Sequence, residues 1–132
     1  MKSGFIEQPG LRVTIDDLVY QPQIADPTGP RHCFAYYITI HNDSAVSFTV
    51  KGRKWVVTNS RGEITAVEGD GVVGQFPKIN PGEKFNYNSF HLIETRTATA
   101  EGSYLGIDGQ GQTVLVRIPR FIMQVPSETF LV

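Results

Sequence analysis

Apolar and polar residues alternate at every second position along much of this chain. The first such stretch runs from Leu11 to Val19, where Val13 and Ile15 share the apolar parity with both ends. A period of two is typical of a β-strand with one buried face. Asp17 interrupts the apolar parity, which indicates a bulge or a strand edge at that point.

The clearest alternation follows a polar segment from Gln21 to Arg31 that contains three prolines. It predicts a strand from Cys33 to His41. One face of this strand carries only large apolar and aromatic residues: Phe34, Tyr36, Ile38 and Ile40. We therefore expect this face to lie in the core.

Turn signals divide the rest of the chain into short strands. The expected strands are residues 48–50, 53–58, 63–67, 84–92, 99–107 and 113–123. In the second of these Trp55 and Val57 share the inward parity, and in the fourth Phe85, Tyr87, Ser89 and His91 share one parity. Pro119 interrupts the last strand and places it at an edge or a bend.

The pattern contains about seven to nine strands and no window with a convincing helical period. It predicts an all-β fold, an antiparallel β-sandwich. A chain of 132 residues is the size of one domain, so we expect a single domain over residues 1–132.

Charge excludes some partners. The chain has 12 Lys and Arg against 13 Asp and Glu, a formal net charge of -1. Such a balance does not predict binding to nucleic acid or to an anionic membrane. The basic pair Arg53-Lys54 is interpreted as a solvated face.

Cys33 is the single cysteine and cannot form an internal disulfide. A lone thiol suits a reducing compartment. The N-terminal residues lack an apolar signal core, and no run of about eighteen apolar residues occurs. We expect a soluble cytoplasmic protein.

Three glycines, Gly69, Gly71 and Gly74, have the spacing G-x-G-x-x-G. In dinucleotide-binding proteins this spacing precedes a helix whose N-terminus holds the pyrophosphate. Pro77 and Pro81 prevent a helix here. The favoured interpretation is a bend between strands.

The alternative is a phosphate site without a helix, in which backbone amides of Gly69, Gly71 and Gly74 surround an anion and Lys78 adds charge. Asp70 would repel the anion unless a divalent cation lay between them. A phosphate bridged by a divalent cation such as Mg²⁺ or Co²⁺ is therefore favoured over a bare phosphate.

Candidate metal ligands are the acidic residues Glu68 and Asp70, which distant strands could bring to His91 or Glu101. No pair of histidines or cysteines has metal-ligand spacing. The residues also lack a local nucleophile and base arrangement, so we expect no catalytic residues and no enzymatic activity.

A third class is a protein-binding module, because a sandwich offers an exposed sheet edge and end loops. Val72, Val73 and Phe76 around the glycines would form an apolar partner patch if they are exposed. Burial of the same side chains would make them a cap on the end of the sandwich.

Several motifs in order resemble those of the ApaG family, also called CorD. They are Phe34-Ala-Tyr-Tyr-Ile-Thr-Ile-His-Asn42, Arg53-Lys-Trp-Val-Val-Thr58, Gly69-Asp-Gly-Val-Val-Gly74, the segment from Pro77 to Ser89, Glu101-Gly-Ser-Tyr104 and Ile118-Pro-Arg-Phe121. The resemblance covers about residues 7–126. Ala98 and Ala100 depart from it, since the family usually has Gly and Met at these places.

The resemblance implies an immunoglobulin-like or fibronectin type III-like sandwich. It also implies a link to cobalt and magnesium homeostasis, suggested pyrophosphate binding at the three glycines, and a protein-binding role like that of eukaryotic relatives. The leading hypothesis is a non-enzymatic module that binds a protein partner. The runner-up is a divalent-cation-dependent binder of nucleotide polyphosphate; partner identity and oligomeric state stay open.

Overall fold

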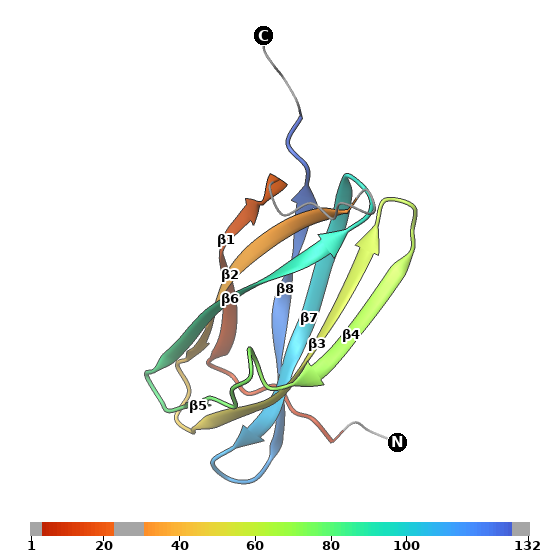
Figure 1. Cartoon of the computed structure of the whole chain (residues 1–132). Coiled ribbons are helices and arrows are strands. Elements are labelled where there is room, and N and C mark those ends of the chain that lie inside the picture. The colour runs from red at the N-terminus through yellow and green to blue at the C-terminus, as the bar shows by residue number, and fades with distance from the viewer. Residues whose placement is uncertain (1–3, 23–30, 128–132) are drawn as a thin grey trace.

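A computed structural model describes residues 4–22 and 31–127 of the chain (Figure 1). The described part is all-β, and the fold prediction is confirmed. Its eight strands are β1 (Leu11–Tyr20), β2 (His32–Asn42), β3 (Phe48–Asn59), β4 (Ile64–Asp70), β5 (Lys78–Ile79), β6 (Lys84–Ile93), β7 (Thr97–Asp108) and β8 (Thr113–Gln124). These residues include no helix of the length and apolar character that a bilayer crossing requires.

The strands form two antiparallel sheets that face each other. The smaller sheet has the order β1-β2-β6, and the larger has the order β4-β3-β7-β8, with β5 beside the start of β3. On one side of the sandwich β1 lies against β8 and brings the two sheets together. On the other side the edge strands are β4 and β6 (Figure 1).

Alternate residues of both sheets fill the core, as the period of two predicts. The inward face predicted for β2 is confirmed: Phe34, Tyr36, Ile38 and Ile40 are all buried. Trp55 of β3 and Tyr104 of β7 meet them from the larger sheet, with 2% and 0% of their surfaces exposed.

A bulge in β1 changes which of its residues face the core. The pairing of β1 with β2 shifts between Ile15 and Asp17, which confirms the predicted irregularity. An extra residue in a strand reverses the parity of everything after it. Leu18 and Tyr20 therefore pack against the core, and the prediction that Val19 shares the inward face is wrong.

The strands predicted at 48–50 and 53–58 form one strand, β3, whose pairing with β7 shifts between Val50 and Gly52.

β8 is an edge strand, as predicted from Pro119. Its pairing with β7 shifts across Pro119, because a proline cannot donate a ladder hydrogen bond. Ala98 and Ala100, the two departures from the family pattern, are buried in β7.

Candidate binding groove

The three glycines lie at the end of β4 and in the loop that follows. Gly69 is within β4, and Gly71 and Gly74 have positive φ angles of 59° and 79°. Val72 and Gln75 exchange both backbone hydrogen bonds, at 2.9 and 2.8 Å, around a two-residue turn. With Val73 at φ 42° and Gly74 also positive, this is a type I′ turn, and no helix follows it.

The backbone of this loop is already hydrogen-bonded within the protein. The amide of Gly71 donates to Lys51 O at 2.9 Å, and the amides of Val72 and Gln75 donate to each other's carbonyls. A phosphate nest needs such amides to point at the anion. These three amides are therefore not available to an anion unless their present hydrogen bonds break.

The charged candidates around this loop face solvent. Lys78 is exposed in β5, and Glu68 and Asp70 are exposed on the outer side of β4, where Glu68 lies 3.9 Å from Lys54 Nζ. His91 instead lies between the sheets, where it stacks with core aromatics. Within residues 4–22 and 31–127 no three His, Cys, Asp or Glu side chains converge as metal ligands.

The predicted apolar patch at the loop is smaller than expected. Val73 and Phe76 are 49% and 54% exposed, but Val72 is fully buried in the core. The inclusion of Val72 in a surface patch is wrong, because its bridge to Gln75 turns its side chain inward. Val73 and Phe76 remain available on the surface.

A larger feature is a groove on the open side of the sandwich, between the two edge strands β4 and β6. Its volume is about 670 Å³. Inward-facing residues of β3 and β4 form one wall, and β6 forms the other. The sandwich is open here because β4 and β6 each end their sheets, whereas β1 and β8 pack together on the opposite side.

Aromatic side chains form the floor of this groove. The ring of His91 lies 4.6 Å from that of Trp55 and 4.9 Å from that of Tyr36, and Phe121 packs against all three. Burial lowers the pKa of His91 to about 4. His91 is therefore a neutral imidazole at physiological pH.

Two polar atoms in the floor have no hydrogen-bond partner among the described residues: Nε1 of Trp55 and Nε2 of His91. A buried polar atom left unpaired costs about 1–3 kcal/mol. Both residues line the groove. Both atoms are enclosed by protein, below the open part of the groove.

The rim of the groove carries exposed apolar side chains. Val67 of β4 is 46% exposed, and Phe90 and Leu92 of β6 are 56% and 40% exposed. All three residues line the groove, but only Val67 shares the inward face; Phe90 and Leu92 alternate with the inward-facing His91 and flank the rim from the outer face of β6. Apolar side chains gathered along two strand edges are typical of an interaction surface.

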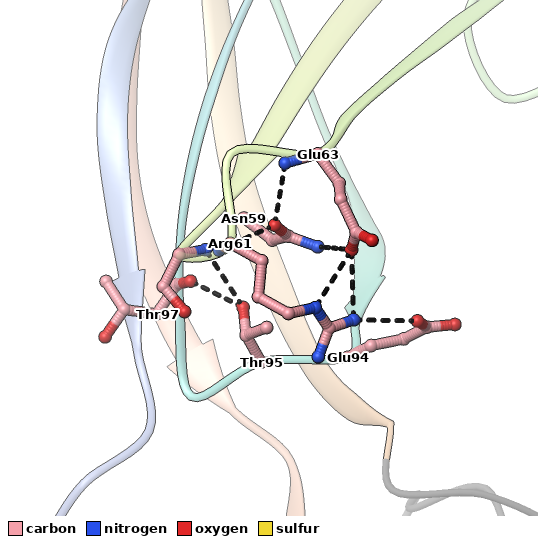
Figure 2. A network of polar contacts seen from close by, with 7 residues as sticks. Asn59, Arg61, Glu63, Glu94, Thr95 and Thr97 are labelled. Atoms are coloured by element: carbon pink, nitrogen blue, oxygen red, sulfur yellow. Dashed lines mark hydrogen bonds and ion pairs between the residues drawn. The ribbon is translucent and has the colours of Figure 1, made fainter.

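A polar network at one end of the groove joins the β3–β4 turn to the loop after β6 (Figure 2). Nη2 of Arg61 lies 3.0 Å from Oε1 of Glu63 and 3.6 Å from Oε1 of Glu94, so Arg61 connects the two segments. The amide of Ser60 donates to Thr95 Oγ1 at 3.3 Å, and that hydroxyl donates to Thr97 O at 2.7 Å. The network therefore connects the two sheets at this end of the groove.

Arg53 lies toward the other end, beside Tyr36 and Ser89. Its Nη1 donates to the carbonyls of Asp70 and Gly71 at 2.9 and 3.0 Å. Lys54, the next residue, is exposed on the opposite face of the sheet. The interpretation of both as one solvated face holds for Lys54 and is wrong for Arg53.

Three inward-facing tyrosines lie near Arg53: Tyr36 and Tyr104 are buried, and Tyr87 is half-buried. Burial raises the pKa of Tyr36, Tyr87 and Tyr104. The hydroxyls of Tyr87 and Tyr104 are 2.5 Å apart. These phenols are neutral hydrogen-bonding groups inside the sandwich.

The residues that could supply catalysis have structural surroundings. Burial raises the pKa of the Cys33 thiol, which disfavours the reactive thiolate. His32 Nδ1 lies 3.0 Å from the Tyr20 hydroxyl, and His41 Nε2 lies 2.9 Å from the Thr14 hydroxyl. These histidines each belong to a different local contact.

Sequence reasoning did not find the groove. The available signal was parity, since Arg53 shares the inward parity of Trp55 and Val57. Parity places a residue on one face of its own strand. It does not show that β4 and β6 are the edges that leave this face open.

The fold and the groove define a small immunoglobulin-like β-sandwich protein with one laterally open side. Residues 22–107 match the family model of the ApaG domain. The chain belongs to the ApaG family, which confirms the resemblance seen in its motifs.

Relatives and solved structures agree with this assignment. The chain is 38% identical to protein ApaG of Sodalis glossinidius over 92% of its own length and 97% of the relative's length. A crystal structure of an ApaA-named protein from Bordetella pertussis matches with a TM-score of 0.79 at 31% identity, covering 93% of this chain and all of that one. A structural-genomics X-ray structure matches with a TM-score of 0.83 at 28% identity, covering 92% of both chains.

Proposed function

We propose that this ApaG-family chain is a non-enzymatic, cytoplasmic binding module whose groove receives an extended segment of a partner protein. The observation that carries the proposal is the position of the groove between the free edges of β4 and β6. An edge strand has backbone groups available to pair with an added strand. The apolar rim supplies pockets for side chains of that segment.

The dimensions of the groove suit a short extended segment. Its inward-facing residues run along β3 from Arg53 to Asn59. At about 3.3 Å per residue this path is about 20 Å long, which matches about six residues of extended chain. Both strand edges border this path, so either could form the additional ladder.

The chemistry of the groove supports binding over catalysis. His91 is the only titratable histidine that lines it, and a pKa of about 4 makes it a weak base at neutral pH. The aromatic floor and apolar rim are suited to hold side chains of a partner. The proposed link to cobalt and magnesium homeostasis comes from the family resemblance alone.

The alternative of a nucleotide polyphosphate held with a divalent cation at residues 69–74 is less well supported. The amides of Gly71, Val72 and Gln75 are hydrogen-bonded within the loop region. An anion there would have to break these bonds before it could use them. The groove offers an open surface without that cost.

Selection from a displayed library of random seven-residue peptides tests the proposal. Peptides enriched on the purified chain are synthesised and mapped by amide chemical shifts. We expect saturable shifts along β4 and β6 and at the indole N–H of Trp55, the single tryptophan. Shifts confined to residues 71–77, or no enrichment over an empty support, would contradict the proposal.

Two substitutions in β4 form a matched pair for this test. Val67 faces the groove, and its neighbour Ala66 is exposed on the other face. Val67→Asp should weaken peptide binding by about tenfold or more, because it puts a charge into an apolar contact. Ala66→Asp adds the same charge to the same strand and should leave binding unchanged.

A titration with ATP, with and without Mg²⁺ or Co²⁺, tests the alternative in the same spectra. Saturable shifts confined to residues 68–78 would favour a polyphosphate site. No shift at millimolar ligand would remove it. Product formation that is lost in Asp70→Ala would contradict the non-enzymatic assignment.

A further inference from the structure

Arg53 is a half-buried cation at the edge of the groove floor. Its Nη1 is held by the carbonyls of Asp70 and Gly71, and Nε and Nη2 have no hydrogen-bond partner among the described residues. Among residues 4–22 and 31–127, ion pairs join Arg12, Lys54, Arg61 and Arg117 to carboxylates, and Arg53 takes part in none of these pairs. Arg53 has a fixed position and an uncompensated charge.

Gly69 explains how Arg53 reaches this position. A Cβ on Gly69 would stand 2.8 Å from Cζ of Arg53, so the guanidinium lies directly on the backbone of β4. The two carbonyl bonds hold it there at one edge. Orienting the fork in advance lowers the entropy lost when its remaining donors bind an acceptor.

Trp55 places an aromatic surface in the groove floor beside Arg53. It is 2% exposed, and its ring packs against those of Tyr36 and His91. It follows Arg53 by two positions on the same face of β3, about 7 Å along the strand. An extended chain in the groove would pass both side chains within two or three of its residues.

We propose, on the basis of the binding function above, that Arg53 recognises a carboxylate of the bound segment, so that the groove selects an acidic extended peptide. The carboxylate accepts hydrogen bonds from Nε and Nη2 of Arg53. Apolar residues of the segment lie toward Val67 and the aromatic floor.

The charge of the groove favours a carboxylate over a phosphate group. The groove lining holds two cations, Arg31 and Arg53, and two carboxylates, Glu63 and Glu94. Arg61 pairs with both of these carboxylates at the end of the groove where the β3–β4 turn meets the loop after β6. The four lining charges sum to zero. The groove therefore has no excess positive charge to match a phosphate dianion, whereas one carboxylate of the segment is enough to pair with Arg53.

The peptides selected on the wild-type chain test this inference directly. We expect an Asp or Glu at one fixed position of the enriched sequences. Replacing that residue by its amide, Glu→Gln or Asp→Asn, in the synthetic peptide should weaken binding by about tenfold or more, because a charge-assisted bond is lost. This measurement uses the unaltered protein and does not depend on the folding of a variant.

A matched pair of protein variants then identifies the cation. Arg53→Gln and Lys54→Gln remove the same charge from adjacent residues on opposite faces of β3. Arg53→Gln should bind the acidic peptide and its amide form equally, whereas Lys54→Gln should discriminate as the wild type does. Amide spectra of both variants confirm that the fold is retained.

The outcomes separate this inference from the binding function on which it rests. Enriched peptides that shift β4 and β6 but contain no fixed acidic residue, or bind equally after Glu→Gln, overturn the role of Arg53 and leave the groove as a peptide site. Absence of any groove-binding peptide overturns both. Synthetic peptides with free or amidated C-termini distinguish a side-chain carboxylate from a terminal one. A phosphoserine peptide that binds more tightly than the acidic peptide would contradict the preference for a carboxylate.

Discussion

The guanidinium of Arg53 rests on Gly69, where a Cβ would lie 2.8 Å from Cζ and from both Nη atoms. This contact joins β3 to the end of β4 and gives the first glycine of the G-x-G-x-x-G spacing a structural role. Gly69 makes space for a side chain from the neighbouring strand.

A double-mutant cycle tests this contact. Gly69→Ala should destabilise the wild type by about 1–2 kcal/mol, because the guanidinium must move and lose its carbonyl bonds. In an Arg53→Ala background the same change should be neutral or stabilise by about 0.5 kcal/mol, because Ala suits a strand better than Gly. Urea denaturation of the four proteins measures the coupling, and additive effects would contradict the contact.

The other two glycines should respond very differently to alanine. At Gly71 an added Cβ would lie 2.2 Å from Gln75 O, and the residue has φ 59°. At Gly74 nothing lies within 4 Å, and only its φ of 79° opposes a side chain. We expect Gly71→Ala to cost about 3 kcal/mol or more and Gly74→Ala about 1 kcal/mol. Thermal unfolding of both variants checks the order, and equal losses would show that backbone angle alone decides.

The turn between β3 and β4 depends more on Asn59 than on the ion pairs drawn beside it (Figure 2). Asn59 Oδ1 accepts the amides of Arg61 and Glu63 at 2.9 and 3.0 Å. Asn59→Ala should therefore cost about 1–2 kcal/mol, through loss of two turn-forming bonds. Arg61→Ala removes only solvent-exposed ion pairs and should cost less than about 0.5 kcal/mol. Chemical denaturation compares them, and a larger loss for Arg61→Ala would reverse this ranking.

His91 should make stability depend on pH between neutral and mildly acidic conditions. Burial lowers its pKa to about 4 in the folded chain, whereas an unfolded His titrates near about 6.5. Below about pH 6.5 the unfolded state binds a proton that the folded state does not, so stability falls as the pH is lowered toward 4. Between pH 7 and pH 5 the loss from this residue is about 2 kcal/mol.

Comparison with His91→Gln isolates this contribution, since glutamine does not titrate. The free energy of unfolding is measured in urea at pH 7 and pH 5 for both proteins. We expect the decrease to be smaller in the variant by about 2 kcal/mol. The window lies above the range in which most carboxylates titrate. Equal decreases in the two proteins would mean that His91 is protonated at pH 5 without cost.

The class of the fold and the faces of most strands follow from the order of residues alone. Alternation over Phe34 to Ile40 is a local property, because successive side chains of a strand point to opposite sides whatever its neighbours are. Pro77 and Pro81 likewise exclude a helix after Gly74 by local geometry. The motifs also identified the ApaG family before any contact was known.

Which of these faces stay open depends on how the strands are ordered in the folded chain. Local alternation does not reveal that β4 and β6 are edges, that the bulge before Asp17 turns Val19 away from the core, or that the turn at Gln75 buries Val72. Arg53 and Lys54 look alike in sequence, yet pairing with β4 places them on opposite faces. The groove depends on strand order and on contacts between residues far apart in the chain, and a periodic pattern contains neither.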